Sequence, residues 1–590
     1  MSLDAAESQG ELTGAPASGP MHQVMGRRWM VAAGHPLAAQ AAARILAAGG
    51  NAVDAGVAAG MVLGVAHPDM VSFAGVAPLL VHVAKTRETF EVSGVGPYPR
   101  RATSEYFRTQ CGGEIPHGLL RTVVPAAPDA WCTALARAGT MRFAEVAAPA
   151  LECAREGFPL SVFSAYNISR SAERYRQWPT SAPIYTPGGS PLPPGGRFVQ
   201  ADLADAIEMM IAAEGAARRR GRARAIRAAR DVFYKGEIAR RIADFHAREG
   251  GLMAYEDLAA FEVEVAPALR TSFRGYEVAA CGFWCQGPVF LQMLNLIEPY
   301  DFKRLGHNSP QALHVLVEAM KLAFADREAY YGDPHHVKVP ADALLSRAYA
   351  DARRALIHED RAWPEMPPAG DPASLAAVRN GARVYPPAAA GAGEANDRGT
   401  SYVCVIDAEG NGFSATPSDP SVDSPVVPGV GCVVSPRGSQ GWLAPGHPSE
   451  VAPGKRPRLT PAPAMVLRDG QVFMPFGTPG GDVQQQAMLQ VLLNVVEFGM
   501  LPQQAVEAPR VASRSFPDSF WPHPYAPGVL EAERRVPAET LAALAALGHG
   551  VREWPEWDWR AGAVCAITRS PDGTLMGGAD PRRGAHAIGW

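Results

Sequence analysis

The residues of this sequence best suited to chemistry are Gly399 and Thr400. The stretch before them, 386–394 (PPAAAGAGE), is too small, too flexible and too rich in proline to form a packed element. If the chain were cut between Gly399 and Thr400, Thr400 would carry both a hydroxyl nucleophile and its own α-amine. An unperturbed α-amine titrates near ~7.7–8.0, so it can act as the base that activates this hydroxyl. The pattern therefore predicts an N-terminal threonine nucleophile made by cleavage of the chain.

The residues after Thr400 predict the element that holds it. Residues 401–406 (SYVCVI) alternate in the manner of a β-strand, and we expect that strand to begin at Thr400. Turn residues at 407–411 (DAEGN) then allow 412–415 to return as the hairpin partner. On this segment alone, a β-forming threonine that merely opens a strand after a glycine turn is the simpler interpretation, so both stay open.

A glycine turn at 477–482 (GTPGGD) is the second candidate for chemistry. Gly480 and Gly481 precede a helix predicted at 484–498, and consecutive glycines can leave adjacent backbone N–H groups unpaired and directed into a cavity. Acyl transfer needs such donors as an oxyanion hole. Neither G-x-G-x-x-G nor G-x-x-x-x-G-K-[ST] occurs there, which makes phosphate binding the weaker interpretation. A plain glycine turn ahead of a helix is the alternative.

Hydrophobic periodicity places helices and strands in separate regions. Helices are predicted at 37–48, 52–63, 202–213, 309–331, 484–498 and 540–547, and strand and turn residues dominate from 400 to about 480. The 590 residues are too many for one ordinary core, so we expect several domains or two interleaved halves. The pattern indicates an α+β or layered α/β fold rather than a doubly wound sheet.

The composition limits which partners and cofactors are expected. A net charge of −4 gives no general attraction to nucleic acid or anionic membranes. The basic run at 218–230 lacks interleaved aromatic residues, so we expect a solvated helix face there. Residues 1–25 lack the apolar core of a secretory signal and no run of 18 apolar residues occurs, which predicts a cytoplasmic protein without a membrane partner. The eight cysteines form no C-x-x-C pair or zinc-type cluster, so no metal and no cofactor are expected.

Several blocks along the chain match one known family. They are GGNAVDA at 49–55, AREGFP at 154–159, ADREAYYGDP at 325–334, the run 400–411, PGKRP at 453–457 and GGADPR at 577–582. Together they resemble the γ-glutamyltransferase family of N-terminal nucleophile hydrolases over nearly the whole length. The family's spacing from Thr400 to Asn411 is kept without gaps, so the resemblance favours the nucleophile interpretation of Thr400.

The resemblance implies a four-layer αββα sandwich that is made as one inactive precursor. It divides the chain into a disordered tail (1–25), a large-subunit portion (26–385), a flexible processing linker (386–399) and a small catalytic portion (400–590). After cleavage at 399/400 the two portions would form one intertwined fold.

The resemblance also assigns roles within the small portion. Thr400 would be the nucleophile in self-cleavage and in catalysis. Gly480 and Gly481 match the oxyanion glycines of the family. Ser418 falls where the family has a threonine whose hydroxyl supports the nucleophile.

The chain departs from γ-glutamyl enzymes where the substrate is held. Their arginine–glutamate pair, which grips the glutamyl α-carboxylate, aligns near Val95 and Gly96, and the asparagine twenty positions after the nucleophile becomes Pro420. A site built for polar groups discriminates through them, so their loss is expected to abolish preference for glutathione. The pattern is more similar to the amidase branch of the family, which acts on small amides such as oxamate.

Polar residues of the small portion form the predicted substrate site. Arg437 is the candidate partner of a substrate carboxylate, because a planar guanidinium suits bidentate recognition, and Lys455 and Arg456 are the alternatives. The other predicted substrate-binding residues are Ser439, Gln440, Thr460 and Asp482.

These observations predict a self-processing amidohydrolase. Its partners would be a small-molecule amide, oxamate-like or otherwise carboxylate-bearing, and the two chains of its own precursor, with a homo-oligomer of processed heterodimers as a further option. One alternative is a γ-glutamyl hydrolase or transpeptidase with a rearranged clamp. The alternative of another class is an unprocessed binding protein without catalysis.

Overall fold

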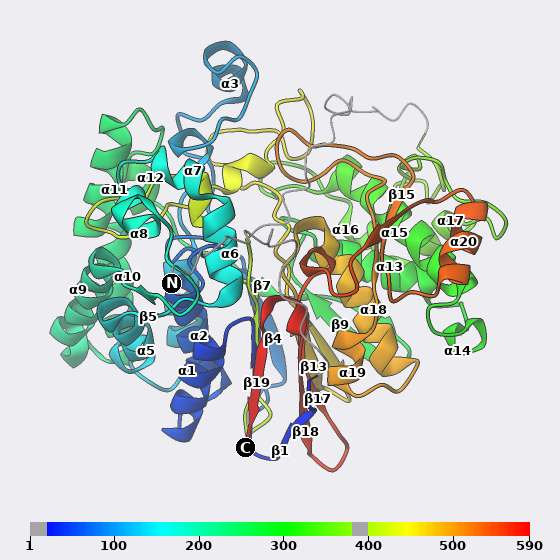
Figure 1. Cartoon of the computed structure of the whole chain (residues 1–590), viewed down its shortest axis with the longest axis horizontal. Coiled ribbons are helices and arrows are strands. Elements are labelled where there is room, and N and C mark those ends of the chain that lie inside the picture. Colours follow the sequence, from blue (N-terminus) through cyan, green and yellow to red (C-terminus); the bar gives the residue numbers. More distant parts are fainter. Residues whose placement is uncertain (1–20, 380–398) are drawn as a thin grey trace, which may run out of the picture.

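Two seven-stranded β-sheets face each other in the computed structural model, which describes residues 21–379 and 399–590, and helices cover the outer face of each sheet (Figure 1). This arrangement is the predicted αββα sandwich. The first sheet has the order β19-β2-β10-β11-β3-β4-β7. Its strands are β2 (Met30–Ala33), β3 (Leu79–Val83), β4 (Glu88–Val92), β7 (Val265–Pro267), β10 (Val403–Ile406), β11 (Gly412–Ala415) and β19 (His586–Gly589).

The second sheet has the order β1-β18-β17-β13-β12-β9-β8. Its strands are β1 (Val24–Gly26), β8 (Leu269–Phe273), β9 (Tyr276–Ala280), β12 (Ala464–Arg468), β13 (Gln471–Gly477), β17 (Cys565–Arg569) and β18 (Leu575–Ala579). Each sheet thus combines strands from before and after Thr400. Cleavage there would leave two chains that share both sheets.

The alternation along β10 shows how the sequence sets the layers. Val403 and Val405 pack in the core under the first helical layer, whereas Cys404 and Ile406 pack in the core between the two sheets. β11 pairs with β10 in antiparallel register, from Val403 opposite Ala415 to Ile406 opposite Gly412. The predicted strand and hairpin are confirmed, but the strand begins at Val403 and not at Thr400.

Two groups of helices bury the outer faces of the sheets. The helices of the first layer are α1 (Pro36–Ala47), α2 (Ala52–Ala66), α4 (Ala127–Ala138), α5 (Phe143–Glu156), α6 (Val162–Arg170), α9 (Ala201–Ala217), α10 (Arg222–Tyr234) and α11 (Glu237–Arg248). The helices of the second are α13 (Gly287–Ile297), α15 (Pro310–Tyr330), α17 (Arg347–Arg354), α18 (Gln484–Val496) and α20 (Ala538–Ala546).

Helix α2 explains why the first layer is rich in alanine and glycine. A Cβ at Gly56 would lie 2.1 Å from the Phe413 ring, and a Cβ at Gly60 would lie 2.6 Å from Trp131. The helix can therefore pack this close to β11 and to α4 only without side chains at these two positions.

The structure corrects two local predictions. The predicted tail 1–25 is too long, because Val24 pairs with Gly577 in the second sheet; residues 1–20 lie outside the described part of the chain, as do 380–398, which hold most of the predicted linker. The basic run is not simply solvated, because the Arg230 guanidinium is buried and donates two hydrogen bonds to Asp129, at 2.9 and 3.0 Å.

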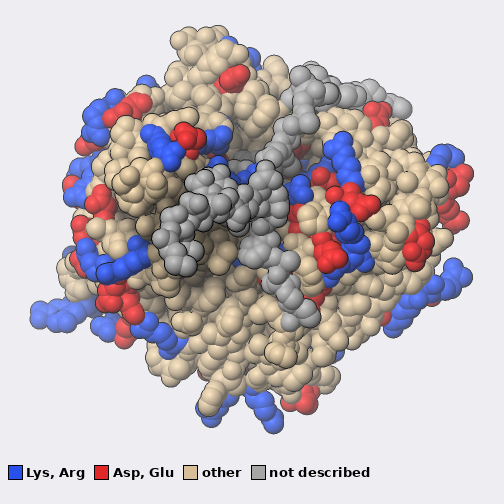
Figure 2. Space-filling view, in the orientation of Figure 1, with Lys and Arg blue, Asp and Glu red and all other residues tan. Residues whose placement is uncertain are grey.

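Charged side chains of both signs are interspersed over the helical layers on the face shown in Figure 2. Within 21–379 and 399–590, no helix combines the length and apolar character that a membrane crossing requires.

Candidate active site

Thr400 is held in an unusual backbone conformation just before β10. Its φ is 74°, a region that β-branched residues rarely adopt, and the preceding Gly399 has a φ of 99°. The Thr400 N–H donates to the Met70 carbonyl oxygen at 2.7 Å, and the next N–H donates to Pro417 at 2.9 Å. Such a conformation costs on the order of 1–3 kcal/mol and persists only where neighbouring structure imposes it. The strain therefore lies at the peptide bond that was predicted to be cut.

Among the described residues, the Thr400 hydroxyl forms a hydrogen bond with one side chain, that of Ser418. The two oxygens are 2.6 Å apart and both residues are buried. Ser418 is fixed in turn by its backbone N–H, which donates to Val76 at 3.0 Å. The structure thus brings together the predicted nucleophile and the residue predicted to support it.

Arg437 reaches this pair from the short helix η5 (Arg437–Gln440). Its Nε donates to Asp419 Oδ1 at 2.5 Å, its Nη2 donates to Ser418 Oγ, and its Nη1 lies 3.4 Å from Thr460 Oγ1. Burial raises the pKa of the Asp419 carboxyl, and the Arg437 guanidinium opposes that rise. The guanidinium is therefore already engaged by protein groups, and its predicted contact with a substrate carboxylate stays a prediction.

Three other predicted substrate residues lie around Arg437. Gln440 donates from Nε2 to Thr460 Oγ1 at 3.0 Å, and the same Thr460 oxygen lies 3.4 Å from Arg437 Nη1. Ser439 belongs to the same short helix η5, and its carbonyl oxygen accepts from the Trp521 N–H at 2.7 Å. The structure brings the predicted residues into one cluster, and their contact with substrate remains a prediction.

The glycine turn follows β13. Gly480 and Gly481 have φ values of 126° and 55°, which L-residues rarely adopt. Within the described ranges, neither N–H donates a backbone hydrogen bond. A Cβ at Gly477 would lie 2.3 Å from the ring of Tyr402, which places the start of the turn against a residue two positions after Thr400. The turn has the free donors that an oxyanion hole requires.

Asp482 anchors this turn. Its Oδ1 accepts from Arg327 Nη1 at 2.5 Å and from the Ser519 hydroxyl at 2.7 Å, and its Oδ2 accepts from the Ser519 N–H at 2.7 Å. With both oxygens engaged and the side chain buried, the geometry fits support of the glycine turn better than the predicted contact with substrate.

We expect Asp482→Asn to lower thermal stability, because removing one charge of a buried ion pair costs about 3–5 kcal/mol. The measurements are the apparent melting temperature and the KM of the cleaved enzyme. If Asp482 supports the glycine turn, the variant should have a lower melting temperature, and its KM should change less than about threefold. A KM raised tenfold at unchanged melting temperature would restore the substrate-binding role.

Two residues, one beside Ser401 and one beside the glycine turn, were not predicted from the sequence. His67 Nδ1 is 3.4 Å from Ser401 Oγ, and Arg583 Nη2 is 3.9 Å from the place of a Cβ at Gly480. Burial first, and then the charge of Arg583, lower the pKa of His67 to about 3, so the imidazole is neutral at pH 7. Arg583 adjoins the block at 577–582, which is the signal that points to it.

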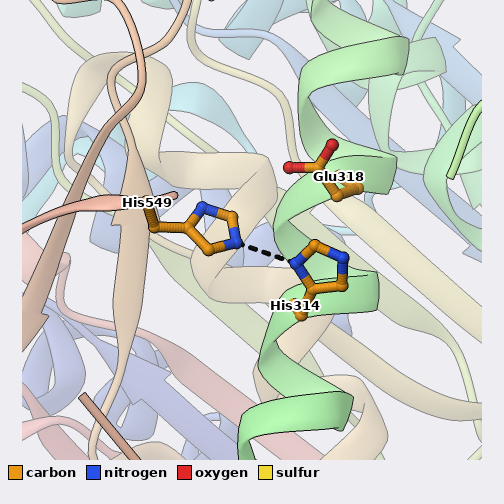
Figure 3. A group of neighbouring side chains, drawn as sticks. All are labelled: His314, Glu318 and His549. Atoms are coloured by element: carbon orange, nitrogen blue, oxygen red, sulfur yellow. Dashed lines mark hydrogen bonds between the residues drawn. The ribbon is translucent and has the colours of Figure 1, made fainter. Parts of the chain in front are cut away.

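A buried group away from this site has the residue types of a metal centre. His314, Glu318 and His549 place one ligand atom each within 4.8 Å of one another (Figure 3). Glu318, however, accepts from the Lys321 ammonium at 2.7 Å and from the Trp363 N–H at 3.1 Å, and His314 Nδ1 lies 2.9 Å from His549 Nε2. A cation would have to displace the ammonium, so these contacts favour a polar cluster that ties α15 to the turn after α20.

A comparison with known proteins matches residues 38–590 to the Gamma-glutamyltranspeptidase family. The chain belongs to this family. It is 36% identical to the Acylase ACY 1 proenzyme of Pseudomonas sp. (strain SE83), over 94% of this chain and 92% of that protein. It is 32% identical to the Glutathione hydrolase-like YwrD proenzyme of Bacillus subtilis (strain 168), over 96% and 99% of the two chains.

Solved structures give the same result. The crystal structure of cephalosporin acylase from Bacillus halodurans superposes with a TM-score of 0.84 at 28% identity, covering 99% of each chain. The fold is therefore that of the N-terminal nucleophile hydrolases in this family, and the protein is an enzyme, as the resemblance implied.

Proposed function

We propose that this member of the gamma-glutamyltranspeptidase family is a self-processing amidohydrolase with Thr400 as its nucleophile. The observation that carries the proposal is the 2.6 Å contact of Thr400 Oγ1 with Ser418 Oγ at a strained Gly399–Thr400 junction. The relatives named as proenzymes support a precursor that is cleaved.

Self-cleavage begins with attack of Thr400 Oγ1 on the carbonyl carbon of Gly399. The C–N bond breaks, the acyl group moves to the threonine oxygen as an ester, and Thr400 gains a free α-amine. Water then hydrolyses the ester to the Gly399 carboxylate and the Thr400 hydroxyl. In catalysis the α-amine takes the hydroxyl proton as Oγ1 attacks a substrate amide, and the N–H groups of Gly480 and Gly481 stabilise the oxyanion. The C–N bond of the amide then breaks, the α-ammonium returns the proton to the leaving amine, and the acyl group remains on Oγ1 as an ester. Water hydrolyses this ester, which releases the acid and restores the Thr400 hydroxyl.

The substrate we propose is an amide other than a γ-glutamyl compound. Where the resemblance aligns the glutamyl-gripping pair, Val95 is buried and apolar, and a Cβ at Gly96 would lie 1.9 Å from the Val124 carbonyl oxygen, so neither position offers a charged group to a substrate. Nearby, the Tyr98 hydroxyl donates to Gly438 at 3.0 Å and fills the space beside η5. The acylase names of two relatives support this class, and a carboxylate on the amide, as in oxamate, stays a prediction.

Three p-nitroanilides that differ by one group each test this proposal. We expect γ-glutamyl-p-nitroanilide to react with a kcat/KM at least about 100-fold below that of glutaryl-p-nitroanilide, which lacks only the α-amine. The aligned clamp positions, Val95 and Gly96, offer this ammonium no charged partner, and burying an unpaired charge is costly. Butyryl-p-nitroanilide, which lacks the carboxylate as well, shows whether that carboxylate is recognised. Release of p-nitroaniline is followed by absorbance. A γ-glutamyl kcat/KM in the ordinary range of about 10⁴–10⁸ M⁻¹ s⁻¹, equal to or above the glutaryl value, would establish the γ-glutamyl alternative instead.

A further inference from the structure

Arg437 is linked to the nucleophile through the Ser418 hydroxyl. We propose that Arg437 is a positioning residue that orients the Ser418 hydroxyl so that it donates its proton to Thr400 Oγ1. This inference rests on the proposed function and adds to it a residue that acts on Thr400 without touching the substrate.

The guanidinium of Arg437 is fixed from four sides. Asp419 accepts from Nε, Ser418 accepts from Nη2, Thr460 lies against Nη1, and the Phe520 ring lies 5.2 Å from the guanidinium carbon. The whole side chain is 2% exposed. An arginine held in this way has little rotational freedom, so each of its N–H groups has a fixed orientation.

Hydrogen-bond accounting then fixes the direction of the Ser418 proton. A guanidinium only donates, so Ser418 Oγ must accept from Arg437. Ser418 is completely buried, and Thr400 Oγ1 is the one remaining side-chain partner that the described residues give its hydroxyl. If Thr400 donated to Ser418, the Ser418 O–H would lose its only acceptor, which is costly in a buried place. Arg437 therefore donates a hydrogen bond to Ser418 Oγ, and the Ser418 hydroxyl donates one to Thr400 Oγ1.

This direction of hydrogen-bond donation favours both reactions of Thr400, self-cleavage and amide hydrolysis. Because Oγ1 accepts from Ser418, its own proton is free to go to the base. Negative charge grows on Oγ1 as that proton leaves, and again when Oγ1 is expelled from the acyl-enzyme ester. A donor that is itself bound to a permanent cation stabilises this charge more than a neutral hydroxyl alone.

The first experiment uses the precursor's own Gly399–Thr400 bond as the substrate. The protein is made by cell-free translation with a short radioactive pulse, and the appearance of the two chains is followed during the chase. We expect Arg437→Gln to slow cleavage about 10- to 100-fold, the range for loss of a hydrogen bond to a charged group. Arg437→Lys keeps a cationic donor but loses the planar guanidinium. Its cleavage rate should therefore lie between those of Arg437→Gln and the wild type.

Arg353→Gln is the matched control. Arg353 is equally buried and pairs with Asp326 at 3.2 Å, in the second helical layer. Its loss tests what removal of a buried guanidinium does to folding alone, and cleavage is expected to stay within about threefold of the wild type. If Arg437→Gln does not fold, as circular dichroism would show, the rate of Arg437→Lys decides, and a wild-type rate for it would overturn the proposal.

A double-mutant cycle tests the route through Ser418. In a Ser418→Ala background, Arg437→Gln should change the cleavage rate by less than about threefold, because the link is already lost. If Arg437→Gln slows cleavage equally in the wild-type and Ser418→Ala backgrounds, Arg437 does not act through Ser418. Arg437→Gln could instead raise KM for glutaryl- but not butyryl-p-nitroanilide and leave the cleavage rate unchanged. That result would make Arg437 a carboxylate-binding residue and would contradict the inference. If the wild type is not cut before Thr400, the proposed function itself fails, so the two failures are distinct.

Discussion

Thr400→Ala is expected to leave the chain as a single 62.6 kDa species, whereas the wild type separates into two chains whose masses add to that value. Alanine lacks the oxygen that attacks Gly399, and no other group forms the ester, so cleavage and amide hydrolysis should both be lost. Loss of a nucleophile removes about 10⁴–10⁶ of the rate in comparable hydrolases. The measurement is denaturing electrophoresis with N-terminal sequencing of the smaller chain, which should begin Thr-Ser-Tyr.

Two variants separate the hydroxyl from other effects of the substitution. Thr400→Ser keeps the nucleophile and should still be cut. Thr568→Ala removes a buried threonine hydroxyl from β17 and should process like the wild type. A Thr400→Ala chain that is still cut at the same bond would disprove the nucleophile. A wild-type chain that persists as one band on long incubation would support the unprocessed binding protein.

The strand and hairpin after Thr400 could be predicted because they depend on local sequence. Alternation of period two from 401 to 406 and turn residues from 407 to 411 are sufficient for β10 and β11. The start of the strand could not be predicted, because the positive φ of Thr400 is imposed by contacts with Met70 and Pro417. Those partners come from other segments, and no local pattern shows them.

The positions of the candidate site residues could be predicted from the sequence, but most contacts between them could not. Ser418 could be placed from the family resemblance, and the structure brings its hydroxyl to 2.6 Å from that of Thr400. Gly480 and Gly481 lie in the predicted glycine turn, and their role as oxyanion donors stays a prediction. The role of Asp482 depends on Arg327, which is 155 positions away, and that of Arg437 depends on Asp419, whose neighbours in sequence gave no sign of an ion pair. Charge pairing over such separations is set by the fold and cannot be read from spacing.

Gly480→Ala is expected to lower kcat of the cleaved enzyme by about 10²–10³, the loss found when one oxyanion donor is removed. A Cβ at Gly480 has room, since its nearest neighbour would be Gly562 Cα at 3.5 Å. The obstacle is the φ of 126°, which alanine avoids. Rotation about this torsion turns the peptide plane that carries the Gly480 N–H, so the donor moves away from the place where the oxyanion forms.

Gly548→Ala separates this effect from the general cost of alanine at a positive φ. Gly548 follows α20, has a φ of 101°, and a Cβ there would meet nothing within 4 Å. Both substitutions should lower the melting temperature by similar amounts, since both put an L-residue in the same unfavourable region, at about 1 kcal/mol or more. Only Gly480→Ala should lower kcat, with KM changed less than about threefold, because the oxyanion exists only in the transition state. Equal kcat in the two variants would remove the Gly480 N–H from the oxyanion hole and leave the turn with a structural role.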